Sequence, residues 1–227
     1  MRNLEEKNTV KSENQVNKNT FFEGTENGHP RIMFVGNSIT RHKPAPDIGW
    51  YGDWGMAASA RDKDYVHLCI KHISEKFPNA SFCIIQAAEW ERGYKQCDVE
   101  SVYSEAKDFN PDIIINRMSE NIPMDCLVHD LLIDKMREFH KYLSGNNDNV
   151  KLIVTSNVFA NQKKDEALRD YAEKVSAQYV FLNDLTENKE NLANEYEHEG
   201  VRVHPGDKGM QLIADRLLEV LDDLMVF

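Results

Sequence analysis

A serine that directly follows a short apolar run is the first residue with the chemistry of a nucleophile. Residues 32–36 read IMFVG, and Asn37 and Ser38 come next. A sharp turn after a strand presents such a hydroxyl at the edge of a sheet, where nearby backbone amides can stabilise an oxyanion. The same residues also suit a purely structural turn, in which Gly-Asn-Ser caps a helix. The serine alone therefore leaves both interpretations open.

Two later residues carry complementary chemistry. His204 lies in the sequence VHPGDKG, directly before the last amphipathic stretch, and Asn121 lies in SENIP, shortly after the third apolar run. An imidazole can accept the proton of a serine hydroxyl, and an amide can donate to a developing oxyanion. Together the three side chains could perform acyl transfer, provided that the fold brings them to one place.

The elements that must position them alternate along the chain. Continuous apolar runs occur at residues 32–36, 81–86, 112–116, 151–156 and 179–184. Helical spacing of apolar residues occurs at 66–77, 99–109, 124–143, 167–175 and 210–224. Buried strands interleaved with helices predict an α/β protein, a three-layer α/β/α sandwich with a five-stranded parallel sheet. In such a sheet the site lies at the carboxyl ends of the strands, where Ser38 and Asn121 fall.

Serine after the first strand, asparagine after the third and histidine before the last helix together resemble the SGNH hydrolase superfamily, the GDSL-like esterases and lipases. The resemblance covers about residues 31–227 and implies the flavodoxin-like SGNH hydrolase fold. It implies that Ser38 is the nucleophile, His204 the general base and Asn121 an oxyanion donor. The backbone N–H of Ala88, where the family has glycine, would be a further donor beside that of Ser38. No metal and no organic cofactor is implied.

The chain departs from the family pattern in several places. Asn37 replaces the aspartate before the nucleophile, and Ala88 replaces the glycine of the second motif. Met118 and Ser119 replace the Leu-Gly pair before the asparagine, which is expected to crowd the site. The family's aspartate three residues before the histidine is here Val201.

The acid that would orient His204 is therefore missing or displaced. Glu197 and Glu199 are the nearest carboxylates, and two extra residues looping out would let a glutamate reach the imidazole. Glu197 is the preferred candidate, because Glu199 beside Gly200 is typical of a solvent-facing turn. A backbone carbonyl that holds the ring in a serine–histidine dyad is the other possibility.

The resemblance implies a serine esterase that forms an acyl-enzyme on Ser38. An aromatic-rich loop at residues 42–55, with Trp50, Tyr51 and Trp54, favours a short acyl group such as acetyl on a carbohydrate. The tryptophans suit either a substrate wall or anchors for the loop. Alternatives are a lysophospholipase- or thioesterase-like acyl hydrolase, or a catalytically impaired carbohydrate-binding descendant of the fold.

Other residues favour structural roles. Arg117 could bind a substrate carboxylate, but an ion pair with Glu89 or Glu120 is the preferred interpretation. The four cysteines contain no CxxC pair and predict buried free thiols. The histidines form no HExxH motif, which argues against a metal site, and no phosphate-binding glycine motif occurs.

Composition bounds the partners. The chain has 227 residues and a formal charge of −11, which repels nucleic acid and anionic membranes. No apolar window is long enough to span a bilayer, and the polar N-terminus lacks the core of a signal peptide, so the sequence as given predicts a cytoplasmic protein unless a leader preceded it. Residues 1–28 are expected to form a flexible arm before a single domain at 29–227. The expected partner is a small-molecule or glycan ester, and the oligomeric state stays open.

Overall fold

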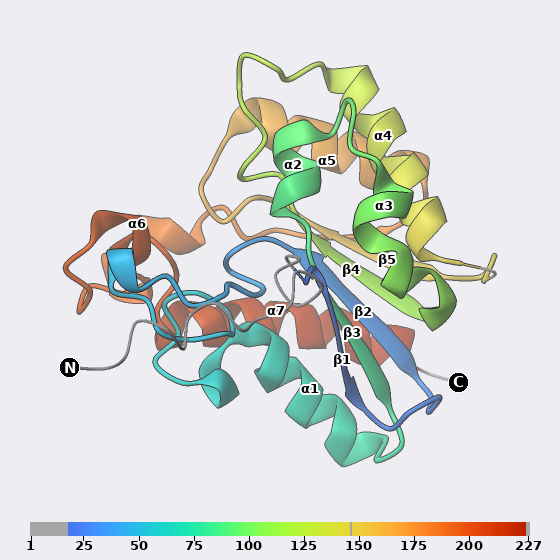
Figure 1. The fold of residues 1–227 in the computed structure, drawn as a ribbon, viewed down its shortest axis with the longest axis horizontal. Coiled ribbons are helices and arrows are strands. Elements are labelled where there is room, and N and C mark those ends of the chain that lie inside the picture. The colour runs from blue at the N-terminus through green and yellow to red at the C-terminus, as the bar shows by residue number, and fades with distance from the viewer. Residues whose placement is uncertain (1–17, 146, 226–227) are drawn as a thin grey trace, which may run out of the picture.

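The computed structural model describes residues 18–145 and 147–225, which form one sheet covered by helices on both faces (Figure 1). The sheet has six strands in the order β1-β3-β2-β4-β5-β6. The strands are β1 (Thr20–Gly24), β2 (Arg31–Gly36), β3 (Ser81–Gln86), β4 (Ile113–Arg117), β5 (Lys151–Thr155) and β6 (Gln178–Val180). All neighbouring strands other than β1 and β3 pair in parallel, as predicted for a three-layer α/β/α sandwich.

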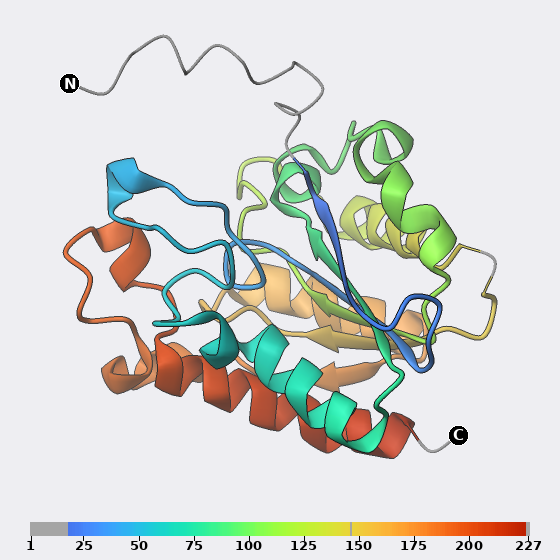
Figure 2. The same cartoon turned by 60° about the horizontal axis from the view of Figure 1, so that its bottom comes forward.

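Two groups of helices cover the sheet (Figure 2). On one face lie α1 (Tyr65–Lys76) and α7 (Asp207–Leu224). On the other face lie α2 (Ala88–Gly93), α3 (Val99–Tyr103), α4 (His129–Leu143) and α5 (Gln162–Lys174). Short helical turns complete the chain: η3 (Pro46–Ile48), η4 (Arg61–Lys63), η5 (Ser104–Phe109), η6 (Leu185–Glu187), η7 (Lys189–Asn191) and α6 (Glu199–Arg202).

The central strand β2 explains why its sequence is continuously apolar. Ile32 and Phe34 point into the core beneath α1 and α7, whereas Met33 and Val35 point into the core beneath the other helices. Both sets are fully buried. Because successive side chains of a strand alternate between its faces, a strand covered on both sides must be apolar throughout.

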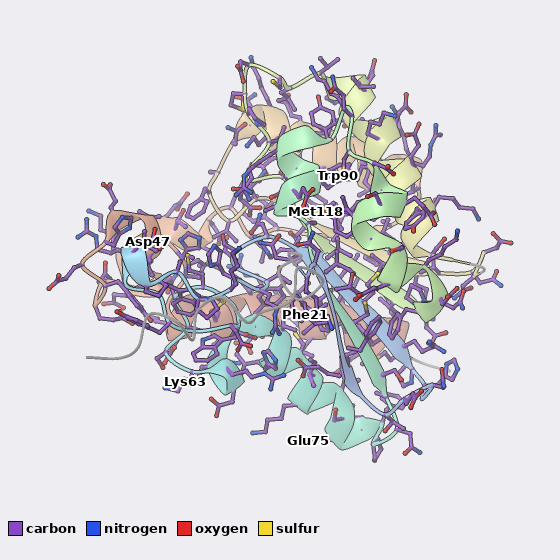
Figure 3. All side chains as sticks on the ribbon, viewed as in Figure 1. Phe21, Asp47, Lys63, Glu75, Trp90 and Met118 are labelled. Atoms are coloured by element: carbon purple, nitrogen blue, oxygen red, sulfur yellow. The ribbon has the colours of Figure 1, made fainter. Side chains whose placement is uncertain are left out.

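The sheet has one strand more than the sequence predicted. Residues 20–24 form β1, which pairs antiparallel with β3, so the expected arm at residues 1–28 is wrong for this segment. Phe21 packs on one core and Phe22 on Phe109 of the other, which supplies the apolar contacts that hold the strand. Figure 3 shows Phe21 on this edge of the sheet. Residues 1–17 of the predicted arm lie outside the described residues.

Two segments that are distant in sequence meet beyond the carboxyl ends of the strands. The loop with η3 and the segment with α6 lie side by side (Figures 1 and 2) and share a small apolar cluster that includes Trp50, Ala193 and Val201. None of the helices in the described part of the chain is long and apolar enough to cross a membrane. The four cysteines are free; Cys69 and Cys83 are buried, and Cys97 and Cys126 are half-buried.

Candidate active site

Ser38 lies in the turn that follows β2, which is an interior strand of the sheet. Gly36 lets this turn run close to the neighbouring strand, because a Cβ at this position would lie 2.8 Å from the carbonyl oxygen of Arg117. The turn is held by Asn37, whose Oδ1 accepts the backbone N–H of Ile39 at 3.3 Å. The serine is thus fixed at the carboxyl edge of the sheet, as the sequence predicted.

His204 reaches Ser38 from the other end of the chain. Its Nε2 lies 2.8 Å from the serine Oγ, across 166 positions in sequence. The backbone N–H of His204 donates to the carbonyl of Val201 at 2.9 Å, and its own carbonyl accepts from Ala193 at 3.0 Å. The ring of Phe159 meets the imidazole edge-on, with centroids 6.1 Å apart. The turn before α7 therefore fixes the imidazole against the hydroxyl.

The environment of His204 favours the neutral imidazole. Burial lowers the pKa of His204 to about 4, and the positive charges of Arg117 and His42 act in the same direction. The carboxylate of Glu120 and a backbone group of Gly200 oppose them weakly. Since a backbone group that raises the pKa of a histidine must be an acceptor, we assign this effect to the Gly200 carbonyl. At neutral pH the ring is therefore unprotonated, which is the state a general base needs.

The prediction that Glu197 orients His204 is wrong. The Nδ1 atom of His204 is buried and makes no hydrogen bond of normal geometry to any described residue, although the backbone of Gly200 raises the pKa of the ring slightly. Glu197 and Glu199 are both exposed. The extra residues do not loop out; they form α6, and His198 caps this turn by accepting the N–H of Gly200 at 3.1 Å. The helical turn thus keeps both carboxylates in solvent.

Asn121 lies in the same region, but its side chain already has a partner. Its Nδ2 donates to Oε2 of Glu91 at 2.5 Å. The amide carries two N–H groups, so one remains for another acceptor while the first is bound. Glu91 is fully buried within α2. The geometry therefore brings the predicted oxyanion donor together with a carboxylate from the neighbouring motif.

The backbone amide of Ala88 is also engaged. It donates to Oε1 of Gln86 at 2.8 Å, within the turn that joins β3 to α2. Ala88 is the first residue of α2, so its N–H belongs to the helix end whose amides have no partner within the helix. A substrate oxyanion would have to displace the Gln86 side chain to reach this donor.

A buried charged network lies beside Ser38 and includes its neighbour Asn37. Arg117, at the end of β4, forms an ion pair with Glu120, with Nη1 2.6 Å from Oε1. The predicted pairing is confirmed for Glu120 and not for Glu89. Asn37 joins both sides: its Oδ1 accepts from Arg117, and its Nδ2 donates to Glu120 at 2.6 Å and to Glu91 at 3.0 Å. Asn37 thus bridges a cation and two carboxylates.

Sequence reasoning missed the position of Glu91. Its signal is helical spacing: Ala87, Trp90, Glu91 and Tyr94 form one buried stripe, and a carboxylate inside such a stripe calls for polar partners. Figure 3 shows Trp90 and Met118 together on the α2 side of the sheet. Burial, followed by the charge of Glu120, raises the pKa of Glu91, and its three hydrogen-bond donors only partly offset that rise.

The aromatic loop supports the site rather than lining it with tryptophan. Trp50 is buried and donates to the carbonyl of His42 at 3.3 Å, and half-buried Trp54 donates to that of Ala58 at 3.0 Å. These contacts favour the anchoring interpretation of both rings. Only Tyr51 is open to solvent, with 74% of its surface exposed.

The comparisons with known proteins rest on structure. No protein-family model matches the chain, and no curated protein sequence does either. Solved structures do: a two-domain esterase active on acetylated mannans has a TM-score of 0.58 and 18% identity. The match covers 87% of this chain and 50% of that one, so the chain spans half the length of this esterase.

Two further structures match over nearly their whole length. A GDSL-like lipase from Bacteroides ovatus has a TM-score of 0.56 and 14% identity, with 86% of this chain and 98% of that chain covered. A catalytic mutant of an acetylxylan esterase from Geobacillus stearothermophilus has a TM-score of 0.53 and 15% identity, with 87% and 94% covered. At these identities the likeness shows the fold, which is SGNH hydrolase-like.

Proposed function

We propose that this protein is a serine esterase that hydrolyses short acyl esters, with acetyl esters of a carbohydrate as the substrate class. The observation that carries the proposal is the 2.8 Å contact between Ser38 Oγ and His204 Nε2 at the carboxyl edge of the sheet. The neutral state of the half-buried imidazole supports the role of His204 as a base.

In the proposed mechanism the imidazole removes the serine proton while the serine oxygen attacks the ester carbonyl. The tetrahedral oxyanion accepts hydrogen bonds from the amides of Ser38 and Ala88 and from the side chain of Asn121. Protonated His204 then gives its proton to the leaving alcohol, and the acyl group stays on Ser38. Water, activated by the same histidine, releases the acid and restores the serine.

The proposed machinery is a dyad without a carboxylate. In this account the carbonyl of Gly200 takes the place of the triad acid, because it is the acceptor that acts on the imidazole beside the nucleophile. A carbonyl favours the tautomer with a proton on Nδ1, which leaves Nε2 free to accept from Ser38. It stabilises the imidazolium less than a carboxylate does, so we expect slower turnover than in a full triad.

The substrate class rests on two observations. Two solved structures with this fold are an esterase active on acetylated mannans and an acetylxylan esterase. In this chain the loop that carries the exposed ring of Tyr51 is tied to the nucleophile, because Met56 donates its N–H to the Ser38 carbonyl at 2.8 Å. An exposed aromatic ring offers a flat face to a sugar.

Hydrolysis of p-nitrophenyl acetate by the purified protein and by the Ser38→Ala variant tests the activity. We expect hydrolysis by the wild type, none above background by the variant, and nearly equal melting temperatures. Retained activity in Ser38→Ala would refute the nucleophile. Release of acetate from acetylated mannan or xylan, compared with hydrolysis of longer acyl chains, then tests the substrate class against a lysophospholipase- or thioesterase-like enzyme.

Two observations favour a second candidate, a catalytically impaired carbohydrate-binding protein. Nδ1 of His204 lacks a carboxylate partner among the described residues, and two of the proposed oxyanion donors have partners within the protein. If the wild type releases no acetate but binds mannan or xylan in a pull-down assay, this second candidate replaces the esterase.

A further inference from the structure

The proposed oxyanion donor Asn121 is hydrogen-bonded to the carboxylate of Glu91, which has no role in the mechanism above. Glu91 Oε2 accepts from Asn121 Nδ2 at 2.5 Å. Its other oxygen, Oε1, accepts from the backbone N–H of Ser119 at 2.5 Å and from Asn37 Nδ2 at 3.0 Å. One side chain thus contacts the residue before the nucleophile and two residues of the segment after β4.

The chemistry of these contacts defines what Glu91 does. All three partners are donors, and an ionised carboxylate is an acceptor with room for each of them. A protonated carboxyl would have to place its hydrogen against a donor. Burial at the root of α2 also fixes the side chain, since Glu91 is 0% exposed. The carboxylate is therefore a rigid, acceptor-only anchor.

We propose that Glu91 is the positioning residue of the oxyanion hole, which holds the Asn121 amide so that its second N–H faces the oxyanion that forms when Ser38 attacks the ester carbon. The inference rests on the proposed esterase function. It also gives Asn37, the residue before Ser38, a carboxylate partner from α2. Ser119 strengthens the anchor, because its N–H reaches Glu91 from a buried backbone with φ of 116°.

The test is a double-mutant cycle on p-nitrophenyl acetate hydrolysis with Glu91→Gln and Asn121→Ala. Asn121→Ala removes the donor and should lower kcat about 100- to 1000-fold with little change in KM. Glu91→Gln keeps the volume but presents an NH2 group to one of the three donors, so Asn121 is mispositioned. We expect kcat to fall by about 10- to 100-fold, again with KM nearly constant.

The decisive comparison is the double variant. If Glu91 acts through Asn121, Glu91→Gln should cost nothing further in kcat once Asn121 is alanine. Equal losses in both backgrounds would overturn the proposal, as would wild-type kcat in folded Glu91→Gln. The control is Tyr171→Phe, which removes a buried hydrogen bond to His140, 2.6 Å long, between α5 and α4 and should leave kcat unchanged.

Two further readouts separate the possible failures. If Glu91→Gln unfolds, Glu91→Asp keeps the charge and shortens the reach, and the same cycle with aspartate should again show no cost in the Asn121→Ala background. If the wild type itself hydrolyses no ester, the proposed function fails and this inference fails with it. An active wild type with an indifferent Glu91 would overturn the positioning role alone.

Discussion

Ser38 and His204 share a 2.8 Å contact, while the opposite nitrogen of the same imidazole is buried without a hydrogen bond to any described residue. Nε2 therefore contacts the serine hydroxyl, whereas the surroundings of Nδ1 supply only the weak effect of the Gly200 backbone on the pKa of the ring. This asymmetry makes the titration of His204 the most informative property of the site.

The pH profile should have its acid limb near pH 4. Burial lowers the pKa of His204 to about 4, so the base stays unprotonated until the pH falls through that value. Because kcat/KM reports the free enzyme, its midpoint on p-nitrophenyl acetate should lie near 4 rather than 6.5. Circular dichroism at each pH checks that the fold survives. A midpoint between 6 and 7 would contradict the burial argument.

Neutralising Glu197 or Glu199 should have little effect on catalysis. Both side chains are exposed, and neither reaches the buried nitrogen of His204. We expect Glu197→Gln and Glu199→Gln to retain kcat within about threefold, as for surface changes away from the chemistry. A fall of about 100-fold or more in one of them would identify a triad acid and refute the dyad.

Replacing Ser119 by glycine should destabilise the protein less than replacing it by alanine. Its backbone has φ of 116°, which costs a residue with a Cβ about 1–3 kcal/mol. Its Oγ donates to Asn157 Oδ1 at 2.7 Å. Ser119→Ala loses this bond and keeps the strain, so it should lower the free energy of unfolding by about 1–2 kcal/mol. Ser119→Gly loses the bond but relieves the strain.

Urea unfolding of the two Ser119 variants gives the comparison. If the Ser119→Gly variant is less stable than the Ser119→Ala variant, the positive φ at this position is not strained. Asn157 is itself held by Asp165, whose Oδ1 accepts its side-chain amide at 2.9 Å, so its position is expected to survive either change.

Stability should fall at alkaline pH through His67. Burial lowers the pKa of His67, but hydrogen bonds to Asp64 and Glu23 outweigh it and raise the value to about 9. Its Nδ1 lies 2.8 Å from Asp64, and Nε2 lies 3.2 Å from Glu23. Arg61 Nε also approaches Nε2, at 2.8 Å, a contact that favours the neutral ring but is outweighed by the carboxylates.

A raised pKa stabilises the fold fully below the unfolded value of 6.5 and loses that effect as the pH rises through 9. His67→Gln should therefore cost about 2 kcal/mol at pH 6 and progressively less towards pH 10. His72→Gln is the matched control, because it removes a half-exposed contact with Asp222. A pH-independent cost for His67→Gln would contradict the assignment.

The sequence was sufficient for those residues whose neighbours along the chain determine their place. Ser38 follows a continuous apolar strand, and His204 precedes a strongly striped helix, so both fall at the carboxyl edge of the sheet by topology alone. The pairing of Arg117 with Glu120 was accessible in the same way, since they lie three residues apart.

Positions that depend on distant partners or on the local conformation of a side chain or turn were not accessible. Glu91 meets Asn121 only when α2 and the segment that follows β4 come together in the folded chain, and Gln86 covers the Ala88 amide through a local rotamer that no pattern encodes. The prediction misplaced Glu197 because the four residues Glu199–Arg202 form a helical turn rather than an extended loop. The strand β1 was missed because residues 20–24, TFFEG, follow a polar stretch and form no long apolar run of their own. Their pairing with β3 cannot be read from so short a segment.

That strand has a consequence for how the molecule behaves among its own copies. Its partner β3, SFCIIQ, is an uncharged hexapeptide with four apolar residues at its centre, and β1 covers the backbone groups along one whole side of it. Such segments with an open edge pair readily with identical strands. A chain beginning at Arg31 would keep every residue of the proposed chemistry, yet we expect light scattering to reveal self-association before any assay could report on the site.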